Sequence, residues 1–458
     1  MIENDAFKLL LINLFHLNPD DIANISCTTF NKMMVLLVTL ADKHQACPYC
    51  GFTAPKIKEY VTKEITHSAL TTQKCIIKYR ARRYKCPCCG KTYYEFNPFV
   101  FKSQKISILT VHNILKDLKD FNETFTSVAR RYHVSPTSVS TIFDNHVDIG
   151  RNPLPEIINF DEVYAFKSEK SKYVCVLLDF KKQIPVDVLP NRKKEYLLNY
   201  FQKIPLEERK KVKYACSDMY EVYRDVVHKV FPCSCMLLDY FHLSQDFHRK
   251  MNEVRIKVMK GYKDDKASDE YYLLKKFNWL LFKNPEDEDK YGRLFDVERE
   301  RKYNSHFKSY MNYYDLRRKL LEINNDLTIC YSLKLELVDF YSKSTIDNAQ
   351  VNLEHLIRSC IDTNIEEMIA FSNNLINWKQ EIINSFTIVG TEYKVEADKG
   401  QVVVCNKKVN NAIIENRNKI IKCIKNNANG YTNWSRFRNR VMYVLAPNTT
   451  FSLEPREK

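Results

Sequence analysis

The feature that most constrains this chain is a pair of Cys-x-x-Cys turns. Cys47-Pro-Tyr-Cys50 and Cys86-Pro-Cys88-Cys89 are separated by 35 residues, and a glycine follows each turn. Such a turn presents two thiolates at the spacing that holds one edge of a zinc tetrahedron, and glycine permits the tight backbone. The paired turns therefore predict a zinc ribbon in which Cys47, Cys50, Cys86 and Cys89 hold a structural Zn²⁺.

The other cysteines leave two alternatives open. The chain has 15 cysteines, an odd number, and its first residues lack the basic segment of a secretion signal. We therefore expect reduced thiols in a cytoplasmic protein rather than a disulfide framework. The two turns are also compatible with a redox pair, and Cys88 is a spare thiol that can replace Cys86 or Cys89 as a ligand.

Positive charge is concentrated in two segments. The chain carries 71 Lys and Arg against 56 Asp and Glu, and the whole excess of +15 lies in residues 47–95 and 401–440. Two cationic blocks on a neutral body are typical of a protein that binds a polyanion such as double-stranded DNA, because bound phosphates release counterions. The alternative is charge that serves solubility alone. In the first block, the alternation of residues 76–84 predicts a strand whose basic side chains contact DNA: Lys78, Arg80, Arg82 and Arg83.

Residues 124–146 predict a helix-turn-helix. Their apolar positions keep helical spacing with a break at residues 133–135, after which Ser135 can cap a second helix and Pro136 can begin it. This second helix would offer Thr137 and Ser138 to a DNA groove. A short helical hairpin without DNA contacts gives a similar pattern.

From residue 157 the pattern changes to that of strands. Three runs with period two are followed by a helix, a strand, a helix and a strand. This is the element order of a ribonuclease H-like fold, which places acids of its first and fourth strands side by side. Asp161 and Asp218 occupy those two positions. The ranges are 157–166, 173–180 and 185–191 for the first strands, then 193–203, 212–218, 220–231 and 235–241.

The rest of the chain is expected to be helical, apart from a short hairpin at residues 395–404. Residues 246–390 predict an all-α insertion, and residues 411–426 predict a helix with one apolar and one basic face. Glu415 is the lone acid of the second basic block. It can pair with Lys419 at i, i+4 or serve as a metal ligand.

Taken together, the motifs resemble the ISL3-type insertion-sequence transposases. The resemblance rests on the cysteine turns, the segment RARRYKCPCCGKTY, the helix-turn-helix, and FDEVYAF, SDMYEVY, LDYFHLSQDF, AIIENRNKIIK and GYTNWSRFRNRV. It implies a bacterial DNA transposase with a ribonuclease H-like core and an Asp-Asp-Glu triad. Matched motif by motif, the triad is Asp161, Asp218 and Glu415.

The resemblance also implies the chemistry. Two Mg²⁺ ions held by the three carboxylates would stabilise charge on the attacking and leaving oxygens of a phosphodiester. Cleavage at a transposon end would be followed by attack of the freed 3′ hydroxyl on target DNA. Phosphates would be held by Lys419, Lys422, Arg436, Arg438 and Arg440, and bases would stack on Tyr431 and Trp434.

Other polar residues near the predicted acids receive supporting interpretations. Asp239 is expected to support the ligands without holding the metal, and Glu162 is expected to be structural. His242 and His248 lie six residues apart on one helix, which is poor spacing for joint metal binding, so both are interpreted as packing or surface residues.

The predicted architecture is a multidomain α/β chain. Its partners would be the terminal repeats, the target DNA and a second copy of the chain, in the nucleoid of a bacterium and away from any membrane. The main alternative is a transposase-derived DNA-binding regulator that cannot cut, and a helical scaffold is a distant third. The expected domains are 1–100 with the zinc ribbon, 101–150 with the helix-turn-helix, 151–245 and 391–458 as the two parts of the catalytic core, and 246–390 as the helical insertion.

Overall fold

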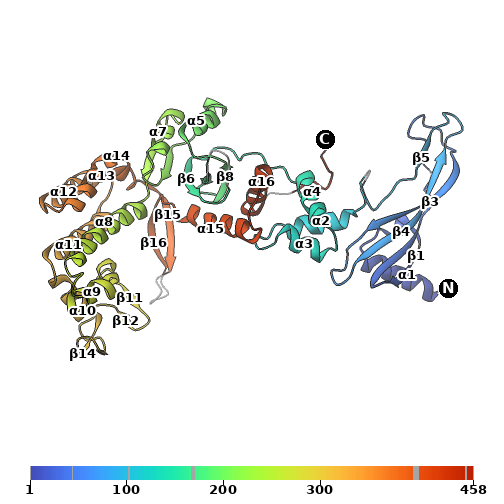
Figure 1. Cartoon of the computed structure of the whole chain (residues 1–458). Helices are drawn as coiled ribbons and strands as arrows, with labels where there is room; N and C mark the ends of the chain where they lie inside the picture. Colours follow the sequence, from blue (N-terminus) through green and yellow to red (C-terminus); the bar gives the residue numbers. More distant parts are fainter. Residues whose placement is uncertain are drawn as a thin grey trace.

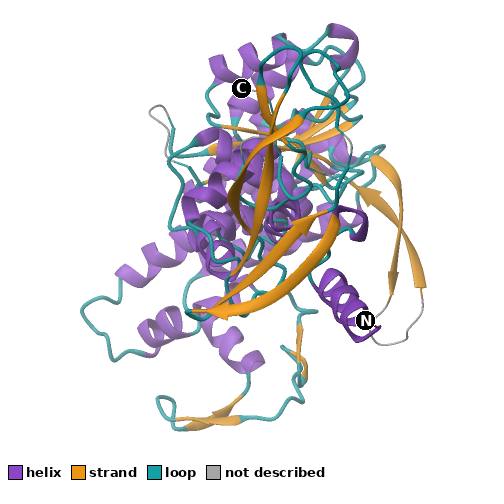
Figure 2. Cartoon of the chain, turned by 90° about the vertical axis from the view of Figure 1, so that its right-hand side faces the viewer, coloured by secondary structure: helices purple, strands orange, loops and turns teal. Residues whose placement is uncertain are grey.

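The computed structural model describes residues 2–43, 45–101, 104–166, 171–395, 402–448 and 451–456. The molecule is elongated, with an N-terminal sheet at one end and a group of helices at the other (Figure 1). Seen along its length, the N-terminal sheet faces the viewer and most helices lie behind it (Figure 2). Within the described ranges, no helix combines the length and apolar character needed to cross a bilayer.

A five-stranded sheet forms the N-terminal end. Strands β1, β2, β4 and β3 lie side by side in this order, and β5 pairs with β4. Helix α1 packs on the sheet through Leu11 and Ile12, and Phe15, directly after the helix, joins the same core. The predicted strand at residues 76–84 is the central part of β4. The sheet around this strand was not predicted from the sequence. The elements are α1 (Ile2–Leu14), a 3₁₀ turn (Pro19–Asp21), β1 (Ile22–Phe30), β2 (Met33–Leu40), β3 (Lys56–Thr66), β4 (Cys75–Lys85) and β5 (Thr92–Tyr94).

Three short helices follow. The helices are α2 (Ile108–Asp117), α3 (Phe125–Arg131) and α4 (Pro136–His146), and α3 packs against α4. The Thr124 side chain caps α3, and the Ser135 side chain caps α4 by accepting from the Ser138 N–H. His133 turns the chain between α3 and α4 with a φ of 54°. Two helices joined by a turn therefore lie where the sequence predicts them.

The central sheet has the order β10-β9-β6-β7-β8. Strands β6, β7 and β8 form an antiparallel meander, whereas β9 runs parallel to β6 and β10 runs parallel to β9. Helices α5 and α7 cover one face, and α15 and α16 cover the other. The elements are β6 (Ile157–Val163), β7 (Val174–Asp179), β8 (Ile184–Leu189), α5 (Lys194–Gln202), α6 (Leu206–Arg209), β9 (Tyr214–Ser217), α7 (Glu221–Val230) and β10 (Cys235–Leu238).

The segment after β10 is mostly helical but not all-α. Two small hairpins interrupt it, so the prediction of a purely helical insertion is wrong in this detail. The hairpins lie between α9 and α10, where short alternating polar and aromatic runs such as Lys302–Asn304 flank turns. The elements are α8 (Tyr240–Lys260), α9 (Asp269–Lys276), a 3₁₀ turn (Asn278–Phe282), β11 (Glu288–Asp289), β12 (Gly292–Arg293), β13 (Lys302–Asn304), β14 (Ser309–Met311), α10 (Tyr313–Glu322), α11 (Asn325–Lys343), α12 (Ala349–Asp362), α13 (Glu366–Asn377) and α14 (Lys379–Asn384).

The chain then returns to the central sheet. A hairpin of β15 (Ile388–Val395) and β16 (Val402–Lys408) leads into α15 (Ala412–Asn427) and α16 (Trp434–Leu445). The hairpin is longer than the predicted one at residues 395–404, of which residues 396–401 lie outside the described residues. Helix α16 packs against β8, and its Tyr443 ring contributes to the core of the three short helices.

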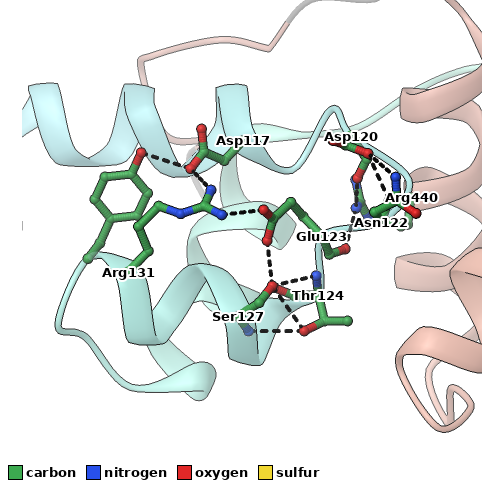
Figure 3. A network of polar contacts seen from close by, with 9 residues as sticks. Asp117, Asp120, Asn122, Glu123, Thr124, Ser127, Arg131 and Arg440 are labelled. Carbon is green, nitrogen blue, oxygen red and sulfur yellow. Dashed lines mark hydrogen bonds and ion pairs between the residues drawn. The ribbon is translucent and has the colours of Figure 1, made fainter. Parts of the chain in front are cut away.

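One buried arginine connects α16 to the loop between α2 and α3. Arg440 is 1% exposed, and its guanidinium donates to the carbonyl oxygens of Asp120 and Glu123, each at 2.8 Å. In the same loop, Glu123 bonds the Ser127 hydroxyl, and Arg131 bridges Glu123 and Asp117 (Figure 3). The contacts of Arg440 attach the three short helices to α16, which packs on the central sheet.

Replacing this arginine should loosen that attachment. Arg440→Met leaves two buried carbonyls without a donor, so it should destabilise α2, α3 and α16 by about 2–4 kcal/mol. Faster amide exchange in these helices would measure the loss. Lys422→Met, at an exposed position of the neighbouring α15, should change stability by less than about 0.5 kcal/mol. Unchanged protection in Arg440→Met would contradict the role given to the arginine.

Candidate active site

Three aspartates lie in a row at the carboxyl ends of the parallel strands. In the β6–β9 pairing, Asn159 lies opposite Cys216, and two residues further on come Asp161 and Asp218. Leu238 pairs with Ser217, and the next residues are Asp239 and Asp218. Because neighbouring strands are about 4.8 Å apart, the three carboxylates share one edge of the sheet.

Asp161 is held by two donors. The backbone N–H of Glu162 donates to Asp161 Oδ1 at 2.8 Å, and the Asn418 amide of α15 donates to Oδ2 at 2.7 Å. Burial raises the pKa of Asp161 to about 7, and the nearby Asp218 carboxylate adds to the shift. It is therefore unfavourable for Asp161 and Asp218 to be ionised together unless a cation binds beside them.

Asp218 has an unsatisfied oxygen. Its Oδ1 atom is buried and has no hydrogen-bond partner. Burial raises the pKa of Asp218, and the positive fields of His242 and Arg192 act in the opposite direction. A buried carboxylate oxygen without a donor is the condition that a metal ion relieves.

Glu415 reaches the same edge from α15. Its Oε1 atom lies 3.9 Å from His242 Nε2, which lies 3.8 Å from Asp239 Oδ2. Ligand atoms of these three residues lie within 4.8 Å of one another, an arrangement that could hold a metal ion. Among the described residues, Glu415 forms its ion contact with His242 and not with Lys419, so the salt-bridge alternative is wrong.

His242 belongs to this cluster, which corrects its interpretation as a packing or surface residue. Its Nε2 atom is buried without a hydrogen-bond partner. His248, one and a half turns further along α8, instead packs edge-on against the Phe282 ring. Asp239 caps α8 and is 4% exposed, and burial raises its pKa. Asp239 therefore lies among the residues that could hold a metal ion with Glu415, whereas it was predicted only to support the ligands.

Two buried asparagines position α15. Asn159 of β6 is fully buried, and its amide donates to the Asn410 carbonyl at 2.8 Å and to Asn411 Oδ1 at 2.7 Å. Because α15 begins directly after this contact, Glu415 and Asn418 face the aspartates. Sequence reasoning missed these asparagines. The available signal was Asn159 itself, a polar residue within an apolar strand, which requires a buried partner.

Glu162 contacts other residues than Asp161 does, although the Asp218 carboxylate adds to the burial that raises the pKa of Glu162. It forms an ion pair with Arg192 and accepts from the Tyr223 hydroxyl at 3.2 Å. Arg192 lies between two aromatic rings, with its guanidinium carbon 4.6 Å from the centre of Tyr173 and 4.7 Å from that of Tyr220.

The four predicted zinc ligands come together at the N-terminal end. Cys47 Sγ lies 3.7 Å from Cys89 Sγ, and Cys50 Sγ lies 3.5 Å from Cys86 Sγ. The turns close through Gly51 and Gly90, whose φ values of 74° and 70° favour glycine. The exposed Cys88 lies outside this group. A cluster of four cysteines within 4.8 Å is compatible with zinc binding.

The basic face of β4 is largely paired within the sheet. Lys78 contacts Glu64 and Arg83 contacts Glu59, each at 2.7 Å. Arg80 is exposed and lies over the Tyr60 ring. Arg82 differs from the prediction: it pairs with the buried Glu95 at 2.8 Å and donates to the carbonyls of Leu40 and Ala41, so it stabilises the sheet.

The predicted phosphate and base contacts of the C-terminal helices need a larger correction. Arg436 pairs with Asp144, Arg438 pairs with Asp187 at 2.6 Å, and Arg440 is buried as described. Tyr431 and Trp434 are partly buried and pack against the core that α15 and α16 form with the central sheet. Basic residues alone did not reveal that acidic partners from distant segments would neutralise them.

Other predicted contact residues remain on the surface. Lys419 and Lys422 are exposed on α15, and Thr137 is exposed on α4. Ser138 is half-buried, and its hydroxyl lies 2.8 Å from that of Ser135 in the cap of α4.

Comparison with known proteins shows the family of the chain. The profile of a transposase family, the ISL3 type, matches residues 158–397, just over half of the chain. The match contains Asp161, Asp218, Asp239 and His242 and ends before Glu415. The transposase for insertion sequence element IS1001 of Bordetella parapertussis is 20% identical over 398 residues, which cover 86% of this chain and 87% of that protein. The chain belongs to the ISL3-type transposase family.

Proposed function

We propose that the chain is a Mg²⁺-dependent DNA transposase that cleaves the ends of its insertion sequence and transfers them to target DNA. The observations that carry this proposal are two. Asp161 and Asp218 follow each other across parallel strands of the central sheet, and beside them Asp239, His242 and Glu415 bring ligand atoms within 4.8 Å of one another. The strand order supports a ribonuclease H-like core.

The residues at this edge fit divalent cations. His242 interacts with four carboxylates, those of Asp161, Asp218, Asp239 and Glu415, and the atoms His242 Nε2 and Asp218 Oδ1 are buried without a hydrogen-bond partner. Hard carboxylate oxygens are the ligands that Mg²⁺ prefers. Asp161, Asp218 and Glu415 would hold two ions, with Asp239 and His242 completing the set. Bound Mg²⁺ supplies charge stabilisation at the attacking and leaving oxygens of a phosphodiester.

The protein's own residues set the geometry. Asn418 fixes the Asp161 carboxylate, and the Asn159–Asn411 contact fixes the start of the helix that carries Glu415. No side-chain nucleophile is required, because water and then a DNA 3′ hydroxyl can attack.

The DNA would be bound by surfaces outside the acid cluster. The exposed Thr137, with Ser138, would face a groove, while Lys419 and Lys422 would contact phosphates beside the site. The exposed Arg80 side chain of β4 is available for a phosphate contact. Lys78 and Arg83 form exposed ion pairs with glutamates, and such pairs are weak enough for a DNA phosphate to replace the carboxylate. Two ends must meet for transfer, so a homodimer acting on nucleoid DNA in the bacterial cytoplasm is part of the proposal.

Cleavage of the element's own ends tests the proposal. Full-length protein is mixed with duplexes that carry the two ends of its insertion sequence, and strand breaks are mapped on gels. Breaks at the ends are expected with Mg²⁺ and should disappear with EDTA and return when Mg²⁺ is restored. DNA binding without any breaks, with Mg²⁺ or Mn²⁺, would instead favour the regulator.

His242 provides a separate prediction about metal binding. His242→Ala should weaken Mn²⁺ binding about 10–100-fold, because it removes a nitrogen from the Asp239–Glu415 pair. Titration followed by electron paramagnetic resonance measures this directly. His355→Ala, an exposed histidine on α12, is the control. Equal affinity in the two variants would exclude His242 from the metal site.

A further inference from the structure

Two exposed tyrosines lie beside the acid cluster. Tyr164 follows the end of β6, three residues after Asp161, and Tyr173 directly precedes β7. Their rings meet edge to face with centres 5.7 Å apart. Tyr164 is 50% exposed and Tyr173 is 39% exposed, whereas the expected stacking residues Tyr431 and Trp434 are partly buried against the core.

A cation accompanies each ring. Lys425 Nζ of α15 lies 5.0 Å from the centre of Tyr164, and the Arg192 guanidinium lies 4.6 Å from the centre of Tyr173. Arg192 is itself fixed by Tyr220 and Glu162. Tyr164 and Tyr173 therefore form an aromatic platform, with a positively charged side chain next to each ring.

Helix α15 joins this platform to the acid cluster. Glu415, Asn418, Lys422 and Lys425 recur every three or four residues, so they share one face of the helix. At one end of this face Glu415 contacts His242, and in its middle Asn418 bonds Asp161. At the other end Lys425 lies over the Tyr164 ring. Along β6, the backbone of Tyr164 is about 10 Å from that of Asp161, which is about three base steps of a DNA strand.

We propose that Tyr164 and Tyr173 stack unpaired bases of the DNA strand that leaves the acid cluster. Nucleobases have apolar faces attached to phosphates, and half-exposed aromatic rings with adjacent lysine and arginine are what single-stranded nucleic acid recognises. This inference rests on the proposed function, because it takes the acid cluster as the place where DNA is cut.

Fluorescence of 2-aminopurine tests the platform without requiring cleavage. The probe is a duplex of the element's end with a four-nucleotide single-stranded tail, in which each tail base in turn is 2-aminopurine. Asp161→Asn protein keeps the DNA intact. We expect quenching at one or two tail positions, lost in Tyr164→Ala and Tyr173→Ala and retained in Tyr164→Phe. Each alanine should weaken binding of the tailed duplex about tenfold relative to the blunt duplex, which corresponds to about 1.4 kcal/mol.

The chain offers a matched control pair. Tyr303 and Tyr310 are 59% and 68% exposed on the β13–β14 hairpin, with ring centres 5.4 Å apart in a similar edge-to-face contact. Tyr303→Ala should leave the quenching unchanged. Quenching that persists in both platform alanines, or that Tyr303→Ala also removes, would overturn the inference.

The inference and the proposed function can fail separately. Cleavage by the parent protein is measured on the same end sequence. Cleavage without tyrosine-dependent quenching would overturn the platform alone. Tyrosine-dependent quenching without cleavage under any divalent ion would support the platform and count against the transposase reaction.

Discussion

Asp161→Asn protein should bind the element's ends with unchanged affinity and cleave them at least about a thousand-fold more slowly than the parent. Asp161 stands between Asp218 and the Asn418 amide, and burial already raises its pKa to about 7. The asparagine side chain has nearly the same shape as the aspartate but lacks the negative charge that would hold the proposed Mg²⁺. Loss of several kcal/mol of transition-state stabilisation corresponds to this factor.

A neighbouring acid provides the control for this experiment. Asp225→Asn, on the surface of α7, removes one carboxylate that pairs with Lys194 and should cleave at the parental rate. Rates come from single-turnover assays on end-labelled duplexes, and affinities come from mobility shifts. An Asp161→Asn protein that cuts as fast as the Asp225→Asn protein would remove Asp161 from the reaction.

Cys86→Ser should abolish stoichiometric zinc and unfold the two cysteine turns. The Cys86 side chain is fully buried among Cys47, Tyr84 and Tyr93, so a lost ligand cannot be replaced by water without opening the cluster. Structural zinc contributes on the order of 10 kcal/mol to the folding of small domains. We expect metal analysis to show about one zinc per parent chain and almost none in the variant.

The adjacent thiol separates a zinc ligand from an incidental cysteine. Cys88 is exposed and outside the cluster, so Cys88→Ser should retain zinc and its protection against proteolysis between residues 41 and 95. Zinc retained in Cys86→Ser, or absent from the parent, would contradict the predicted ribbon. If the cysteine turns form a redox pair instead, the parent protein should contain no zinc and its cysteine thiols should be oxidised to a disulfide reversibly.

The sequence predicted those parts of the site that depend on local pattern. The alternation of residues 157–163 and the apolar run before Asp218 are sufficient to place both aspartates at strand positions, and the cysteine spacing is sufficient to predict which thiols meet. Glu415 required the family resemblance as well, since its own helix equally allowed a pair with Lys419.

The missed residues depend on contacts between distant segments. Asn159 bonds Asn411 across 252 positions, and Arg438 pairs with Asp187 across 251. A single sequence shows that Arg438 is basic, but it does not show that Asp187 of β8 will form an ion pair with it. For the same reason His242 resembled an ordinary helix histidine until α15 brought Glu415 beside it. Strands β1 to β3 were not predicted, because they are strands through their pairing with one another and with β4, which a single sequence does not show.

The contact between Asn418 and Asp161 spans 257 residues, and the whole segment from α8 to β16 lies inside that loop. During synthesis the three aspartates therefore emerge well before the glutamate that joins them. At about 5–20 residues per second this delay is roughly 10–50 s. A ribosome that stops anywhere between α8 and β16 releases a fragment that carries the aspartates and lacks Glu415, so under the proposed mechanism we expect such fragments to leave DNA uncut.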